Sequence, residues 1–383
     1  MSIDSLPQFD GATMDSRKVR PGMAFVALKG DKCDGRDFIP DALAKGAAFV
    51  IEGLDDLARA ASLRRAALKA KVCAVTGSAG KTTTKEFMKA FLSTVGRTYA
   101  TEGNFNNHIG LPLTILNCPQ DAEYLVLEMG TNHPGEIAAL CEIARPDCGI
   151  VTNVGEAHIE FFGTREGIAR EKGVLLANVR EFGVVSRDNA EIGIMREMCK
   201  APLIEADPAE KWLADALAGI LPGAHNVSNA SLAFALAERF GATREKALEA
   251  LEGFALPGSR WRKVEKDGVT YIDDTYNANP SAMIAALDAF AAMPCKGRHV
   301  AVLGDMFELG EKSAELHKKV FGHAMELGIP LVIGVGEESS KCLCHLAYKT
   351  LEPLAKKFRF DVSAGDLVLL KASHGMKLGH LLE

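Results

Sequence analysis

A short glycine loop followed by lysine and threonine carries the clearest chemical signal in the chain. Residues Gly77-Ser78-Ala79-Gly80-Lys81-Thr82-Thr83 follow the apolar run 71–76 and precede a helical pattern at 85–95. Glycines let backbone N–H groups approach phosphate oxygens, a helix N-terminus favours anions, and the lysine and threonine supply a charge and a Mg²⁺ ligand. The pattern therefore predicts a phosphate-binding loop rather than a solvated turn. Val75 stands where the common pattern has its first glycine, so this loop is a shortened variant.

Three further polar side chains follow predicted strands. Glu128 ends the apolar run 124–128, and Glu156 and His158 follow the run 148–155. A carboxylate at the end of an apolar strand is unfavourable without a partner, and ligands of open α/β sheets bind beyond the carboxyl ends of the strands. Taken singly, Glu156 and His158 would each be interpreted as a helix cap or a surface group. Placed together with the phosphate loop, they predict a metal and phosphate site.

Other polar residues allow two interpretations each. Lys172 lies in a helical pattern that by itself indicates a solvated lysine, and the polar segment 273–280 follows a strand as a plain polar turn would. Arg260 and Arg262 come just after the Leu256-Pro257-Gly258 turn. A guanidinium suits a forked phosphate contact, although an ordinary surface arginine is the alternative, more readily for Arg262.

The elements that position these residues form three zones. The first, residues 1–70, mixes a strand-like run, a turn-rich stretch and helical patterns. Residues 71–255 alternate apolar strands with helices, which is typical of a parallel sheet covered by helices. Residues 256–383 repeat that alternation. We therefore predict an α/β protein of three domains: a small N-terminal α/β domain, a central P-loop parallel-sheet ATPase domain and a C-terminal Rossmann-like α/β domain.

Composition bounds the function. The 383 residues are 48% hydrophobic, enough for more than one core, and the formal charge of −6 argues against a general nucleic-acid binder. No apolar run reaches the ~20 residues of a spanning helix, and the N-terminus does not resemble a signal peptide. Nine scattered cysteines indicate free thiols in a reducing compartment. We expect a soluble cytoplasmic protein.

The order of these motifs resembles the Mur ligase family along the whole chain. The matching segments are MDSRKVRPGMAF and GDKCDGRDF in the first zone; TGSAGKTTTKE, GNFNNHIGLP, EMGTNHPGEI, NVGEAHIEFFG and GAHNVSNA in the second; and LPGSRW, DDTYNANPSAM and VLGDMFELG in the third. The DDTYNANPSAM segment resembles the branch that adds D-alanyl-D-alanine. No DNPR-type segment of the diaminopimelate-adding siblings is found.

This resemblance implies an activity. Family members of this branch are ATP-dependent amide ligases that join D-alanyl-D-alanine to UDP-N-acetylmuramoyl-tripeptide through an acyl phosphate, in cytoplasmic peptidoglycan precursor synthesis. The implied cofactors are ATP and two Mg²⁺ ions, and the implied state is a monomer. Two alternatives are a related Mur-type ligase with another peptide specificity and a nucleotide-binding paralogue without turnover.

The resemblance also implies roles for single residues. Gly77 to Thr83 would hold the ATP phosphates, with Asn226, Arg260 and Asp274 as further nucleotide contacts. Thr82 and Glu128 would bind one Mg²⁺, and His158 and a carbamylated Lys172 would help bind the second. Lys81, Glu128, His158 and Lys172 would form the catalytic set. The implied substrate contacts are Ser16, Arg17, Asn277, Asn279 and Ser373.

Some segments depart from the family pattern. Arg36 replaces the histidine of a DGHDF segment, KASH at 371–374 replaces KGSR, and the first domain is shorter than usual. These departures concern the uridine and peptide contacts and leave the phosphate-binding residues unchanged.

Overall fold

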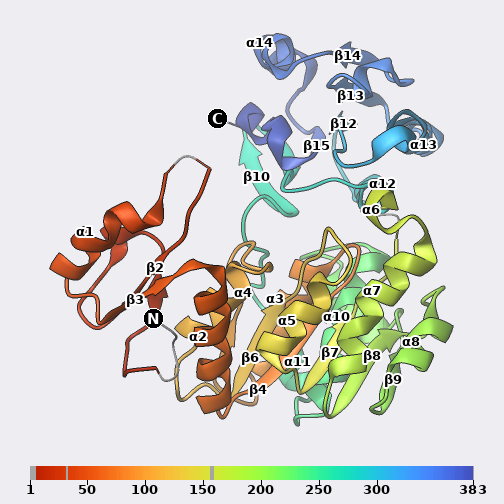
Figure 1. Cartoon of the computed structure of the whole chain (residues 1–383). Coiled ribbons are helices and arrows are strands. Elements are labelled where there is room, and N and C mark those ends of the chain that lie inside the picture. Colours follow the sequence, from red (N-terminus) through yellow and green to blue (C-terminus); the bar gives the residue numbers. More distant parts are fainter. Residues whose placement is uncertain (1–5, 32, 156–158, 383) are drawn as a thin grey trace. The chain divides into compact units, whose positions relative to one another are not determined.

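The computed structural model describes residues 6–31, 33–155 and 159–382 and contains three sheets (Figure 1). The chain divides into two compact units. The first comprises Met1–Val154, Ala169–Asp207 and Asn229–Ala250, and the second comprises Gly155–Ile168, Pro208–Ser228 and Leu251–Glu383. The first unit holds the N-terminal and central sheets and the second holds the C-terminal sheet. The predicted three-domain α/β fold class is confirmed, whereas the domain boundaries at 70 and 255 stay a prediction.

The N-terminal sheet is small and parallel, in the order β1-β2-β3. Its elements are β1 (Ala12–Thr13), β2 (Ala24–Ala27), β3 (Phe49–Glu52), α1 (Ile39–Ala44) and α2 (Gly53–Ala67). The two longer strands contribute buried apolar residues to two cores. One of these cores also contains residues of the central sheet and its helices.

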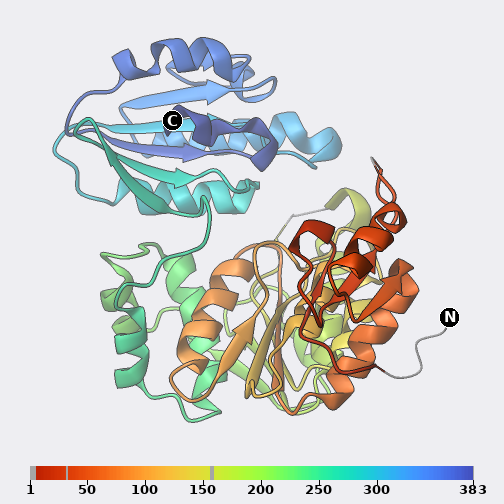
Figure 2. The same ribbon diagram turned by 90° about the vertical axis from the view of Figure 1, so that its left-hand side faces the viewer.

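The central sheet has six parallel strands in the order β5-β6-β4-β7-β8-β9. The strands are β4 (Lys71–Thr76), β5 (Thr98–Ala100), β6 (Tyr124–Glu128), β7 (Cys148–Val151), β8 (Phe182–Ser186) and β9 (Leu203–Ala206). The intervening and following helices are α3 (Lys81–Leu92), α4 (Gly110–Asn117), α5 (Glu136–Ala144), α6 (Ile159–Phe162), α7 (Arg165–Asn178), α8 (Ile192–Met198), α9 (Lys211–Leu217), α10 (Ala224–Glu238) and α11 (Arg244–Leu251). Helices lie on both sides of this sheet in Figure 2, as buried parallel strands require.

The C-terminal sheet has the order β10-β11-β15-β12-β13-β14, with β10 as its antiparallel edge strand. Its strands are β10 (Arg262–Lys266), β11 (Val269–Asp274), β12 (His299–Gly304), β13 (Leu331–Val335), β14 (Leu346–Tyr348) and β15 (Leu367–Lys371). The helices α12 (Pro280–Ala291), α13 (Ser313–Glu326) and α14 (Leu351–Asp361) cover it (Figure 2). The alternation of strands and helices predicted for residues 256–383 is confirmed.

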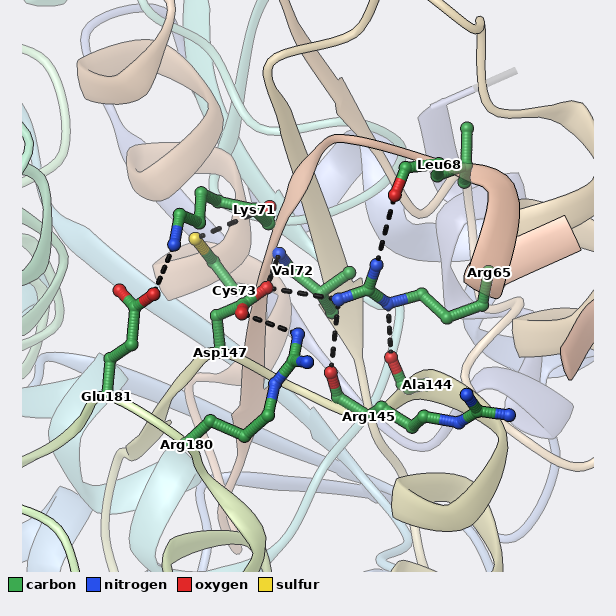
Figure 3. Close-up of polar contacts among 10 residues, drawn as sticks. All are labelled: Arg65, Leu68, Lys71, Val72, Cys73, Ala144, Arg145, Asp147, Arg180 and Glu181. Atoms are coloured by element: carbon green, nitrogen blue, oxygen red, sulfur yellow. Dashed lines mark hydrogen bonds and ion pairs between the residues drawn. The ribbon is translucent and has the colours of Figure 1, made fainter.

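A buried ion-pair cluster ties helices to the amino edge of the central sheet (Figure 3). Asp147 accepts hydrogen bonds from the Val72 N–H at 2.8 Å, from Arg65 at 3.1 Å and from Arg180 at 2.6 Å. Arg65 also donates to the carbonyl of Ala144, at the end of α5. A cavity of about 320 Å³ with further basic residues opens beside the cluster. Cations stabilise the negative C-terminal ends of helices, and Arg65 does so at the end of α5. The basic residues of this cluster are therefore explained by their structural role.

Candidate nucleotide and metal site

The phosphate loop occupies the turn between β4 and α3, as predicted. Gly80 has φ = +80°, a conformation that favours glycine. A Cβ on Gly80 would lie 2.5 Å from Asn229 Oδ1, and a Cβ on Gly77 would overlap the Thr152 hydroxyl. Both glycines are therefore required by close packing as well as by backbone conformation.

The residues that follow β7 form hydrogen bonds with the first residues of this loop. The N–H groups of Ser78 and Ala79 donate to the carbonyl and side-chain oxygens of Asn153, at 3.1 and 3.0 Å. The Thr152 hydroxyl donates to the Ala79 carbonyl at 2.6 Å. Two of the predicted phosphate-binding amides thus have protein partners. Because the first-turn N–H groups of a helix lack partners within the helix, the start of α3 carries most of the anion-binding capacity.

Lys81, Thr82 and Glu128 are brought together, as the resemblance implied. The Lys81 ammonium donates to the Gly77 carbonyl at 2.8 Å. The Thr82 hydroxyl donates to Glu128 Oε2 at 2.9 Å, and Asn106 Nδ2 donates to Glu128 Oε1 at 2.8 Å. Glu128 is only 2% exposed. It forms no ion pair with any residue that the structure describes, and both of its hydrogen-bond donors are neutral. The negative charge of this buried carboxylate is therefore available to a bound cation.

These donors fit the implied magnesium ion in kind, since carboxylate and hydroxyl oxygens are its preferred protein ligands. Among residues 6–31, 33–155 and 159–382, no group of three or more His, Cys, Asp or Glu side chains is arranged so that it could hold a metal ion by itself. The predicted metal set therefore rests on Glu128, Thr82 and Lys172, together with His158. His158 and Glu156 lie outside the described residues.

Asn106 is a site residue that reasoning from single residues missed. Its segment was recognised only as a family motif, without a role. The carbonyl of Asn106 accepts the Gly130 N–H at 2.8 Å, and a Cβ on Gly130 would lie 3.0 Å from the Asn106 side chain. The segment therefore packs directly on the exit of β6, where Glu128 ends the strand.

Lys172 is buried, so its interpretation as a solvated helix lysine is wrong. Its residue is 2% exposed on α7. Burial, followed by repulsion from the Lys81 charge, lowers the pKa of Lys172 to about 7, while Glu171 acts in the opposite direction. Glu171 accepts the N–H groups of Gly135 and Ile137 at 2.9 and 3.0 Å. These bonds fix α7 against the start of α5 and hold Lys172 inside.

The remaining predicted nucleotide residues belong to the second unit. Asp274 accepts from Lys371 Nζ at 2.5 Å, and the Arg260 guanidinium lies 3.3 Å from the centre of the Tyr276 ring. Asn226 is buried and donates to the Pro222 carbonyl at 2.9 Å. Their contacts to nucleotide stay predictions.

Arg262 has a structural role, because it pairs with the buried Asp273 at 2.8 Å. This pair joins β10 to β11. Arg262 is exposed, as the surface interpretation predicted, and its guanidinium also balances the buried charge of Asp273.

The predicted substrate residues have defined local partners. The side-chain oxygen of Asn279 caps α12 by accepting the Ala282 N–H at 2.9 Å, and that of Asn277 accepts the N–H of the next residue. Ser373 is buried and its hydroxyl oxygen accepts the Phe307 N–H at 2.9 Å. These caps explain part of the polar turn at 273–280.

On the uridine side, Ser16 is buried and Arg17 is exposed. The Arg17 guanidinium holds the pKa of Asp15 at about 2. Arg36 forms the same kind of local pair with Asp34. The contacts of Ser16 and Arg17 with substrate stay predictions.

Three Mur ligase domain models match the chain in succession. They are the Mur ligase family catalytic domain over residues 8–92, the Mur ligase middle domain over 75–206 and the Mur ligase glutamate ligase domain over 259–374. The chain belongs to the Mur ligase family. The predicted family is thereby confirmed, together with its ATP-dependent ligase class.

Relatives in other bacteria cover nearly the whole chain. The UDP-N-acetylmuramoyl-tripeptide–D-alanyl-D-alanine ligase of Bacillus subtilis is 33% identical over 98% of this chain and 94% of its own length. The Escherichia coli protein of the same name is 36% identical over 86% of this chain and 82% of its own length. These names agree with the branch that the sequence predicted.

Solved structures show the same architecture. MurF of Acinetobacter baumannii superposes with a TM-score of 0.85 at 28% identity, over 99% of this chain and 94% of that one. MurF ligase of Thermotoga maritima in complex with ADP gives 0.84 at 30% identity, over 98% and 96%. Within the part of the chain that the structure describes, no helix is long and apolar enough to span a bilayer. All nine cysteines are free, as predicted.

Proposed function

We propose that this Mur ligase joins D-alanyl-D-alanine to UDP-N-acetylmuramoyl-tripeptide and hydrolyses ATP to ADP and phosphate. The observation that carries the proposal is the joining of the phosphate loop to Glu128 through Thr82, in a chain similar along its length to ligases with this name. The two sides of this reaction, nucleotide and peptide, correspond to the two groups of predicted contacts.

The chemistry requires an activated carboxylate, because a free carboxylate would have to expel oxide. Transfer of the ATP γ-phosphoryl group to the tripeptide carboxylate gives an acyl phosphate. The amine of D-alanyl-D-alanine then attacks the acyl carbon, and the tetrahedral intermediate expels phosphate. No bond to the enzyme forms, so no nucleophilic serine or cysteine is needed.

The residues of the first unit stabilise the charge that gathers during phosphoryl transfer. Lys81 and the first-turn amides of α3 bind phosphate oxygens and align them with the attacking carboxylate. Thr82 and Glu128 would hold Mg²⁺, which would neutralise phosphate charge. Asn106 orients the Glu128 carboxylate through its 2.8 Å hydrogen bond.

A second Mg²⁺ would be held by His158, Lys172 as a carbamate, and shared Glu128. A protonated lysine repels a cation, whereas a carbamate offers carboxylate-like oxygens. The neutral amine attacks carbon dioxide, its nitrogen–carbon bond forms and one proton leaves. The lowered pKa of Lys172 supports this step because it provides neutral amine near pH 7.

The second unit supplies the predicted nucleotide contacts Asn226, Arg260 and Asp274 and the predicted peptide contacts Asn277, Asn279 and Ser373. Ser16 and Arg17 are the proposed uridine-side contacts. We place the protein in the cytoplasm, where free thiols persist, as a monomer with domains at 1–70, 71–255 and 256–383.

Phosphate release tests the function. It should require ATP, UDP-tripeptide and D-alanyl-D-alanine together, and mass spectrometry should show the UDP-pentapeptide. Phosphate release in the absence of both UDP-tripeptide and D-alanyl-D-alanine would indicate a simple ATPase. Release that requires a different amine in place of D-alanyl-D-alanine would indicate the specificity of a sibling ligase. Lys172→Ala should be inactive and partly rescued by short carboxylic acids, whereas full activity without rescue would exclude the carbamate.

A further inference from the structure

Three loops meet at the carboxyl edge of the C-terminal sheet. The strands β15, β12 and β13 are parallel neighbours, so the segments 372–376, 304–309 and 336–339 that follow them lie side by side. Ligands of open α/β sheets bind at this edge. The segment 304–309, called here the GDMFEL loop, is in the middle.

Asp305 fastens the GDMFEL loop to both neighbours. Its side chain accepts the N–H groups of Ser339 at 2.8 Å and Glu338 at 3.2 Å, and its carbonyl accepts the Ser373 N–H at 3.1 Å. A side chain on Gly336 would overlap the Asp305 carboxylate. The glycine therefore makes this close approach possible.

His317 holds the next residue of the loop from beneath. It is 1% exposed on α13. Its Nδ1 lies 2.7 Å from the Ser313 carbonyl, and its Nε2 lies 2.9 Å from the Met306 nitrogen. Because a carbonyl only accepts, the neutral tautomer with the proton on Nδ1 satisfies both contacts. A fully used imidazole of this kind fixes the backbone at Met306.

Phe307 is presented by this rigid backbone yet remains exposed. The Phe307 N–H donates to the Ser373 hydroxyl oxygen at 2.9 Å, while the residue as a whole is 47% exposed. A Cβ on Gly375 would lie 2.8 Å from Phe307 Cε2, so the ring packs closely on the 372–376 segment. An apolar ring thus lies next to a buried hydroxyl at an edge where ligands bind.

We propose that Phe307 is a specificity-determining contact for the methyl groups of the amino substrate, and that His317 is its positioning residue. This assignment rests on the proposed function. D-Alanyl-D-alanine carries two methyl groups as its apolar side chains, and an aromatic ring removes such groups from water. Contact with one or two methyl groups corresponds to about a four- to fifteenfold effect on affinity.

Phe307→Ala tests the contact. We expect KM for D-alanyl-D-alanine to rise about tenfold, with KM for ATP and UDP-tripeptide unchanged. Selectivity for D-alanyl-D-alanine over glycylglycine, measured as the ratio of kcat/KM values, should fall by a similar factor. Leu343→Ala is the matched control, since Leu343 is 70% exposed in the same sheet unit but precedes β14. Unchanged KM and selectivity in Phe307→Ala would overturn the assignment.

His317→Ala and the double variant with Phe307→Ala test positioning. If His317 acts through Phe307, His317→Ala should raise KM for D-alanyl-D-alanine, and the double variant should have the same KM as Phe307→Ala. His317→Gln should have a KM between those of the wild type and His317→Ala. If the factors by which the two single substitutions raise KM multiply in the double variant, the positioning role is overturned. This result holds even if His317→Ala lowers the melting temperature. A wild-type chain that releases no phosphate with D-alanyl-D-alanine would overturn the proposed function as well. If the wild type releases phosphate with D-alanyl-D-alanine but Phe307→Ala has unchanged KM and selectivity, only this inference is overturned.

Discussion

Replacing Lys172 by methionine should abolish ligation yet make the fold more stable. Lys172 is buried on α7, and burial together with the Lys81 charge lowers its pKa from 10.5 to about 7. The unfolded chain therefore binds a proton more tightly at this position than the folded chain does. Methionine has a similar length and needs no proton, so it removes this penalty.

The sign of the effect follows from proton linkage. A lysine whose folded pKa is depressed destabilises the fold fully below that pKa, and the penalty decreases as pH rises from about 7 towards 10.5. Over the interval from about pH 7 to about pH 9, the wild type should therefore gain about 2 kcal/mol of unfolding free energy from Lys172. Lys172→Met should lack this gain.

Urea unfolding at the two pH values measures the difference. The buffers should be free of carbon dioxide so that no carbamate forms, and the probe should report on the central domain. Lys89→Met is the matched control, because Lys89 is exposed on α3. If the stability of the wild type and Lys172→Met changes in parallel with pH, the reasoning about a depressed pKa is refuted.

Three other changes have definite expected outcomes. Glu128→Gln should keep the fold, because its amide oxygen can accept from Asn106 while its NH₂ group donates to the Thr82 hydroxyl, which can accept as well as donate. Isothermal titration should nevertheless show at least about tenfold weaker Mg²⁺-ATP binding. Gly80→Ala should destabilise the fold by about 1–3 kcal/mol in chemical denaturation, because of its positive φ and the 2.5 Å approach of Asn229. Asp147→Ala should cost about 3–5 kcal/mol by the same method, since it leaves the buried Arg65 without its carboxylate.

The sequence predicted the strands and turns of the site well because their signals are local. The apolar run before Gly77 is β4, the run ending at Glu128 is β6, and the run beginning at Cys148 is β7. Apolar strands bounded by glycine and polar residues can be recognised without tertiary information. The run at 148–155 nevertheless ends as a strand at Val151, because Thr152 and Asn153 turn to hold the phosphate loop.

Burial and long-range partners could not be predicted in this way. Lys172 has the local pattern of a surface lysine. Only the packing of α7 places it inside, and this packing is fixed by Glu171 of α7, which accepts N–H groups at the start of α5. Asn106 reaches Glu128 from 22 residues away. Asp305 likewise finds its amide partners more than thirty residues away, at Glu338 and Ser339. Nothing in the local sequence specifies such pairs.

The shortened phosphate loop has a structural reason. Val75 is the last residue but one of β4. It is fully buried and is paired in register with Glu128 on one side and with Ile150 on the other. Glycine there would weaken the strand that supports Glu128. The loop therefore begins only at Gly77, and its first amides are tied to Asn153. Phosphate binding then falls to the start of α3, from which Thr82 also reaches Glu128, so one helical turn joins the anion and cation parts of the site.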